Sequence, residues 1–225
     1  MKYLITIILT IASFNLPAKP SVLSEDILLE IRKSNPNVDM EILSSAEQGN
    51  IDAVIETSQM LFRQNNEKLA YLGAELLTFY AKDHAAAKLY LSSRYIEGIE
   101  LISSEGKIKK ILVDYNKSIE YLTDYLENPI KNNNQLYLLA FSMLGTAYYK
   151  NENYKKAGTH FLNNIELVKA EQSGSSAFEL ANLYRDGNGI QEDKEKAFYW
   201  YDFAAKKGLN IAIVERNFLA AELGK

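Results

Sequence analysis

The sequence predicts an all-α protein in which antiparallel helix hairpins stack into a solenoid. Two observations support this prediction. Apolar residues recur at helical spacing along most of the chain, and no strand-length run alternates between apolar and polar residues. In addition, three distant stretches repeat one pattern of leucine, small residue and tyrosine, which is typical of stacked helix pairs.

The N-terminus has the organisation of a secretory signal peptide. Lys2 provides a positive start, an apolar block runs from Tyr3 to Phe14, and Ala18 offers a small residue at a cleavage position. The alternative, a retained membrane anchor, would need about 20 apolar residues, and the block is shorter. No cysteine follows the block, so a lipid-attached lipoprotein is not expected. We therefore predict that residues 1–18 are a signal peptide cleaved after Ala18, and that the mature chain is periplasmic or secreted.

Composition excludes several classes of protein. The chain has 225 residues and a formal net charge of −4, whereas a nucleic-acid binder normally shows a basic surface. It contains no cysteine, which excludes disulfide frameworks and thiolate metal sites and makes the chain indifferent to an oxidising compartment. We expect no cofactor, no metal, no nucleic-acid partner and no membrane span after signal cleavage.

Helices are expected along residues 19–82, ahead of the first repeated stretch at Ala87. One lies in the N-terminal segment 19–38, around Leu28 and Ile31, and Pro36 stops it. Asp39 is expected to cap the next helix, and further helices follow over 51–64 and 67–82.

The repeated pattern reads small–x–x–x–Leu–small–x–x–Tyr, as in "AKLYLSSRYIEG", "AFSMLGTAYYKN" and "SAFELANLYRDG". Leucine and tyrosine four positions apart share one helical face, and the small residue lets a second helix approach closely. One hairpin cannot bury its apolar stripe alone, so neighbouring hairpins must stack. The positions expected to pack in this way are Leu91, Tyr95, Leu144, Gly145, Tyr148, Ala157, Leu180, Tyr184 and Ala197.

Residues 176–208 resemble a Sel1-like repeat, a relative of the tetratricopeptide repeat. The positions that match the family pattern are Ser176, Leu180, Tyr184, Gly187, Gly189, Ile190, Asp193, Lys196, Ala197, Trp200, Tyr201, Ala204, Ala205 and Gly208, with Ala181 in place of the usual glycine. The resemblance implies a right-handed α-solenoid over 39–225, with repeats at about 46–84, 87–128, 138–170 and 176–208 and a capping helix over 210–222. It also implies packing roles for Gly187, Gly189, Trp200, Ala204 and Gly208.

The glycine pair in "RDGNGIQED" is interpreted as a turn between two helices. A calcium loop would need an oxygen donor at Ile190 and a glycine at Gln191, and a phosphate loop would follow a strand and end in Gly-Lys-Ser/Thr. In a turn, Gly187 takes a left-handed conformation after the first helix, and Asp193 caps the second.

No catalytic constellation is expected. Ser104 and Lys107 form a Ser–x–x–Lys motif without the Ser-Asp-Asn and Lys-Thr-Gly motifs that accompany it in penicillin-recognising enzymes. The two histidines, His84 and His160, form no metal-binding pair, and His160 is expected to pack as Trp200 does.

A concave surface is expected on the first helix of each pair, where side chains point away from the packing stripe. Leu89, Ile96 and Ser142 are expected there, and the predicted partner-binding residues are Ser93, Glu97, Thr146, Tyr149, Lys150, Phe178, Asn182, Arg185 and Asp186. The insertion over 99–113 is either a solvated excursion or a protrusion that binds a partner.

The predicted signal peptide implies an exported protein, and the resemblance implies a non-enzymatic adaptor that binds a protein partner, either an envelope protein or a secreted toxin. A narrower hypothesis is a periplasmic immunity protein that blocks a toxic lipase or a cell-wall effector. A third is an enzyme acting on the cell wall or a β-lactam, which the missing motifs disfavour.

Overall fold

The fold is described from a computed structural model, which places residues 25–34, 38–127, 134–167 and 174–225. The predicted signal peptide, its cleavage position and the first residues of the segment 19–38 lie outside this described part.

The described residues form eleven helices and one β-hairpin. The elements in chain order are α1 (Glu25–Ser34), α2 (Met40–Glu47), α3 (Ile51–Phe62), α4 (Glu67–Ala81), α5 (Ala85–Glu97), β1 (Ile99–Ile102), β2 (Ile108–Ile111), α6 (Tyr115–Glu127), α7 (Asn134–Lys150), α8 (Tyr154–Leu167), α9 (Gly174–Asp186), α10 (Lys194–Lys206) and α11 (Asn210–Leu223).

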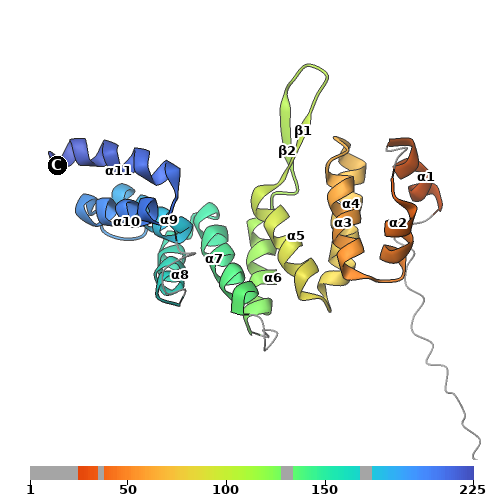
Figure 1. Cartoon of the computed structure of the whole chain (residues 1–225), viewed down its shortest axis with the longest axis horizontal. Helices are drawn as coiled ribbons and strands as arrows, with labels where there is room; N and C mark the ends of the chain where they lie inside the picture. The colour runs from red at the N-terminus through yellow and green to blue at the C-terminus, as the bar shows by residue number, and fades with distance from the viewer. Residues whose placement is uncertain (1–24, 35–37, 128–133, 168–173) are drawn as a thin grey trace, which may run out of the picture.

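The helices form a row of antiparallel pairs that runs from α1 at one end to α11 at the other (Figure 1). Each helix packs on the next along the chain, and the first helices of successive pairs also touch, α3 with α5, α5 with α7 and α7 with α9. This second set of contacts stacks the pairs, so the predicted all-α solenoid of helix hairpins is confirmed. The pairs α3–α4, α5–α6, α7–α8 and α9–α10 lie at the four predicted repeats.

The core is a chain of apolar clusters. The first joins α1 to α5 with the base of the β-hairpin, the second joins α5, α6 and α7, and the others join α7 through α11. Each cluster draws residues from neighbouring pairs, because a single pair cannot enclose its own apolar stripe.

The positions predicted to pack divide by burial. The leucines, alanines and Gly145 are buried, as is Tyr95, whereas Tyr148, Tyr184 and Trp200 are half-buried at the joints between pairs. Gly189 has a φ of +70°, and a Cβ atom there would lie 2.6 Å from the backbone nitrogen of Lys155. Gly208 instead is exposed, has a φ of +87° and contacts nothing within 4 Å of its Cβ direction. Its role is to turn the chain, not to pack.

Helix starts follow the expected capping chemistry. The Asp39 carboxylate accepts a hydrogen bond from the Glu41 N–H, and Asp193 accepts one from the Lys196 N–H. Asn50 and Asn66 cap α3 and α4 in the same way. Gly187 has a φ of +67°, so the predicted turn between α9 and α10 is confirmed.

The insertion contains two short strands that the apolar spacing of the sequence did not indicate. Residues 99–113 contain an antiparallel β-hairpin in which Ile99 pairs with Ile111 and Ile102 with Ile108. The hairpin projects beyond the ends of the helices (Figure 1). Only β1 alternates in burial, and each strand has four residues, so the pattern is too short to be recognised by its period. The sequence signal for a hairpin was a pair of segments, 99–102 and 108–111, that begin and end with isoleucine and flank Gly106. In the structure Gly106 has a φ of +75°, as a turn glycine does.

Candidate protein-binding surface

The predicted partner-binding residues near the C-terminus come together on α7 and α9. The Arg185 guanidinium forms two hydrogen bonds to the Asp186 carboxylate, at 2.7 Å and 3.2 Å, and a third of 3.0 Å to Glu215 on α11. These three bonds hold the guanidinium in one orientation and connect α9 to α11.

A second group of bonds joins α9 to α10. The Asn182 amide donates to the Glu179 carboxylate at 3.2 Å and accepts from the Tyr201 hydroxyl at 2.5 Å. The Phe178 ring lies 5.5 Å from the Tyr201 ring, centroid to centroid. Phe178 and Asn182 are thus fixed by the same tyrosine of the second helix.

Titratable groups in this region are perturbed by burial. Loss of water raises the pKa of Glu179, against the opposing effects of the Asn182 hydrogen bond and the charge of Lys150. Burial also raises the pKa of Tyr149 and Tyr201, and the charge of Arg185 opposes both shifts. The residues of this cluster, which we call the α9 cluster, are Tyr149, Lys150, Phe178, Glu179, Asn182, Arg185, Asp186, Tyr201 and Glu215.

The other predicted residues do not join the α9 cluster. The Ser93 hydroxyl donates to the Tyr90 carbonyl oxygen, and Glu97 forms an ion pair with Arg94 on the same helix. The Thr146 hydroxyl donates to the Ser142 carbonyl oxygen at 3.3 Å. Each of these side chains therefore finds its partner within its own helix, α5 or α7.

Two expected surface residues pack into the core. Leu89 is buried in the cluster between α5, α6 and α7, so the expectation that it lines the concave surface is wrong. Ile96 packs against the same cluster. Residues of both α6 and α7 complete this cluster, and periodicity along one helix cannot show that they do.

Helix α11 adds an apolar surface beyond the α9 cluster. Val214 and Phe218 lie 36 residues after Phe178 and Asn182, which is the spacing between Tyr148 and Tyr184. Val214 is 62% exposed and Phe218 is 70% exposed, and Ile211, half exposed, precedes them on the same helical face. We call these three residues the α11 stripe. Sequence reasoning missed them because α11 lacks the leucine–tyrosine pattern.

Sequence reasoning also missed Glu179, Tyr201 and Glu215. Glu179 directly follows the predicted Phe178, and Glu215 stands 36 residues after Glu179. This repeated glutamate was the available signal. Tyr201 belongs to a second helix and is fully buried, so it supports Asn182 from beneath and is not itself part of the surface.

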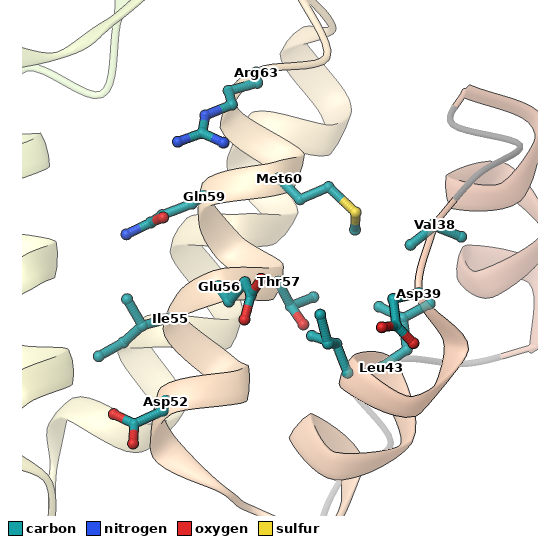
Figure 2. A pocket seen from close by; sticks show the side chains of 11 residues that line it. Val38, Asp39, Leu43, Asp52, Ile55, Glu56, Thr57, Gln59, Met60 and Arg63 are labelled. Atoms are coloured by element: carbon teal, nitrogen blue, oxygen red, sulfur yellow. The ribbon is translucent and has the colours of Figure 1, made fainter.

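A separate pocket of about 460 Å³ lies between α2 and α3, at the other end of the row. Figure 2 shows Thr57 and Met60 of α3 pointing toward Val38 and Leu43. Ala53, Thr57, Ser58 and Leu61 keep the spacing of the repeat pattern, but Thr57 stands where the other pairs have leucine. The Thr57 hydroxyl is buried and has no hydrogen-bond partner among the described residues. Because threonine is shorter than leucine, it leaves space between α2 and α3, where the pocket lies.

The residues considered for catalysis are far from a catalytic arrangement. Ser104 and Lys107 lie in the exposed turn of the β-hairpin, where Lys107 pairs with Glu105. His84 is the N-cap residue of α5 and is exposed, while the His160 ring lies 5.3 Å from the ring of Tyr148. Within the described ranges, no three His, Cys, Asp or Glu side chains gather as metal ligands would. No helix within these ranges has both the length and the apolar character needed to cross a membrane.

Comparison with known proteins agrees with the helical architecture. The Sel1 repeat family matches residues 174–209. One similar solved structure is a protective antigen present in uropathogenic Escherichia coli strains, which displays an SLR fold. It is 25% identical, with a TM-score of 0.56, over 81% of this chain and 36% of that one. The chain thus spans little more than a third of that antigen.

A second similar structure is a Sel1 repeat protein from Oxalobacter formigenes, which shares the fold. It is 19% identical, with a TM-score of 0.51, over 85% of this chain and 79% of that chain. No curated protein is close enough in sequence to count as a match. The chain is therefore a helical solenoid with the fold of Sel1-repeat proteins, and residues 174–209 match the Sel1 repeat model.

Proposed function

We propose that this chain is an exported, non-enzymatic protein-binding module, and that the α9 cluster and the α11 stripe hold a segment of its partner. The observation that carries the proposal is their continuity. Polar and aromatic side chains from α7, α9 and α10 connect through Arg185 to α11, whose three apolar side chains stand in solvent.

The chemistry of this surface is that of a protein interface. Interfaces combine an apolar centre with a polar rim, and tyrosine, phenylalanine and arginine are enriched in them. Phe218 and Val214 supply the apolar part, whereas Tyr149 and Arg185 supply the rim. Arg185 is already held by Asp186 and Glu215, so little conformational freedom is lost when a partner binds.

Exposure of the α11 stripe leaves half or more of each of its three residues in contact with water. Scattered apolar residues on a surface are ordinary, but a stripe beside a bonded polar cluster is typical of an interaction site. The position of the stripe therefore favours binding over a purely structural role for α11.

The experiment compares two exposed aromatic residues. A photo-crosslinking phenylalanine analogue replaces Phe218 in one variant and Tyr199 in the other, and both are irradiated in the cells that produce the chain. Tyr199 lies on α10 and is 59% exposed, so the two positions match in size and accessibility. We expect a discrete protein adduct from position 218 and none from position 199. Equal adducts from both positions, or none from either, would contradict the proposal.

The same experiment separates the two roles open to such a module. A toxic lipase or cell-wall effector in the adduct supports an immunity function, and an envelope protein supports an adaptor function. A hydrolytic activity that Ser104→Ala abolishes would contradict a non-enzymatic role.

Export is part of the proposal and has its own measurement. We expect the intact mass of the chain recovered from its cells to correspond to a polypeptide that starts at Lys19. A recovered chain that retains residues 1–18 would contradict cleavage after Ala18.

A further inference from the structure

We propose that the outer edge of β2 is a second docking site, distinct from the α9 cluster, which takes an extended strand of a partner protein. The strand would carry an apolar and an acidic side chain two positions apart. The proposal rests on which backbone groups the hairpin leaves outward, and on the side chains beside them.

The hydrogen-bond pattern of the hairpin decides the direction of each backbone group. The Ser103 N–H donates to the Lys107 carbonyl oxygen at 2.9 Å, so residues 103 and 107 form a bonded pair. Bonded and non-bonded pairs alternate in an antiparallel ladder. Ile102 and Ile108 therefore form a non-bonded pair, as do Glu100 and Lys110, and their N–H and C=O groups point away from the partner strand.

The outer edge of β1 is occupied by Asn65, which lies in the turn between α3 and α4. Its side-chain oxygen accepts from the Ile102 N–H at 2.6 Å, and its amide nitrogen donates to the Ile102 carbonyl oxygen at 2.8 Å. The Asn65 side chain thus makes the two bonds that a residue of a third strand would make. Lys109 pairs with Glu67 at 2.8 Å and further fixes the hairpin to α4.

The outer edge of β2 has no such cover. Among the described residues, no hydrogen bond reaches the outward backbone groups of Ile108 or Lys110. Both side chains are exposed, and Figure 1 shows the hairpin standing clear of the helices. An open edge of this kind can be extended by a strand from another chain.

The side chains beside this edge define the chemistry of the added strand. Ile102 is 56% exposed and Ile108 is 64% exposed, and they lie opposite each other on one face of the hairpin. A strand added beside β2 would extend this row, and an apolar side chain next to Ile108 would cover it. On the same face Lys110 lies opposite Glu100 at 3.7 Å, a weak exposed pair. An acidic side chain on the added strand, next to Lys110, would give this lysine a second carboxylate partner beside Glu100.

A second copy of this chain fits the edge poorly. If two β2 strands pair antiparallel about Ile108, Lys107 lies opposite Lys109 of the other copy. If they pair about Lys109 or Lys110, that lysine lies opposite itself. Like charges directly opposite each other destabilise a strand pair. Each of these registers opposes lysines, so the edge favours an acidic strand from a different protein.

The experiment uses a synthetic octapeptide and the amide hydrogen exchange of the full chain, followed by NMR. Odd positions of the peptide alternate valine and glutamate, and even positions are threonine. At a peptide concentration ten times its dissociation constant, we expect exchange of the Ile108 and Lys110 amides to slow about tenfold. The Glu100 amide, which points outward on the opposite edge, serves as the internal control and should not change.

Two variants and one altered peptide complete the test. Ile108→Pro removes an outward N–H that the hairpin does not use, so it should abolish protection of the Lys110 amide while the thermal midpoint stays unchanged. Lys110→Glu should prefer a peptide with lysine in place of glutamate. Absence of protection at millimolar peptide, protection of Glu100 instead, or unchanged binding by both variants would overturn the proposal.

Discussion

The ring of Phe161 covers the Cα of Gly145 so closely that a Cβ atom there would lie 2.7 Å from the Phe161 Cε1 atom. Phe161 is almost fully buried, so its ring has little room to move away. The small residue of the repeat pattern is therefore required by contact between α7 and α8. We predict that Gly145→Ala lowers the free energy of unfolding by about 1–3 kcal/mol, the usual cost of overpacking a filled core.

Gly158 in α8 provides the matched control for Gly145. A Cβ atom at Gly158 would meet its nearest neighbour, the Leu183 Cδ1 atom, at 3.4 Å, an ordinary van der Waals distance. Alanine favours a helix interior over glycine by about 1 kcal/mol, so Gly158→Ala should leave stability unchanged or raise it. Urea unfolding of both variants measures the difference, and equal losses would show that close contact is not the cause.

Much of the fold follows from side-chain spacing. Leu144 and Tyr148 share a helix face, and Gly145 admits the second helix, so the stacking of pairs could be predicted from local pattern alone. The α9 cluster was predicted in part, because Tyr149 and Arg185 stand at equivalent positions of successive first helices.

The rest depends on contacts between distant segments. Asn65 bonds to Ile102 across 37 residues of sequence, and this contact fixes the hairpin beside the turn between α3 and α4. A local pattern in the sequence cannot predict such a contact. The Arg185–Glu215 pair depends on the angle between α9 and α11. The period of apolar residues along one helix does not predict the angle between two helices. Leu89 shows the same limit, because residues of α6 and α7 bury a position that was expected on the surface.

Thr57 offers a test of the pocket between α2 and α3. Its buried hydroxyl has no hydrogen-bond partner among the described residues, and an unsatisfied buried polar group costs about 1–3 kcal/mol. Valine has the same shape without the hydroxyl. We predict that Thr57→Val raises the free energy of unfolding by about 1 kcal/mol, as measured in urea.

Thr57→Ser supplies the control for this substitution, because it keeps the hydroxyl and removes the methyl group. It should lower stability by about 1 kcal/mol, the value of one buried methyl group. A loss of stability in Thr57→Val would mean that the hydroxyl has a partner in solution.

His160 should make the protein less stable as the pH falls. Burial and the charge of Lys156 lower the pKa of His160, whose ring lies against Phe141 and Tyr148. A histidine with a lowered pKa opposes folding once it is protonated. Its contribution is therefore present above the unfolded pKa of about 6.5 and is lost as the pH falls below that value.

The measurement compares His160→Phe with the natural chain, by urea unfolding between about pH 8 and about pH 5. Phenylalanine keeps the ring contacts and does not titrate. We expect the natural chain to lose more stability on acidification than the variant. Parallel curves would show that His160 does not carry the dependence.

Glu179 should behave in the opposite direction, and its variant tests whether the α9 cluster is kept for binding. Burial raises the pKa of Glu179, so the charged carboxylate opposes folding. Stability from this group is present below the unfolded pKa of about 4.3 and is lost as the pH rises through the higher folded pKa. Glutamine keeps an oxygen that accepts from Asn182 and carries no charge. We therefore expect Glu179→Gln to be more stable than the natural chain at neutral pH, with the difference vanishing in acid.

If the carboxylate is retained for a partner, the same variant should give a weaker adduct from a photo-crosslinker at position 218. Higher stability with an undiminished adduct would show that the partner does not use this charge.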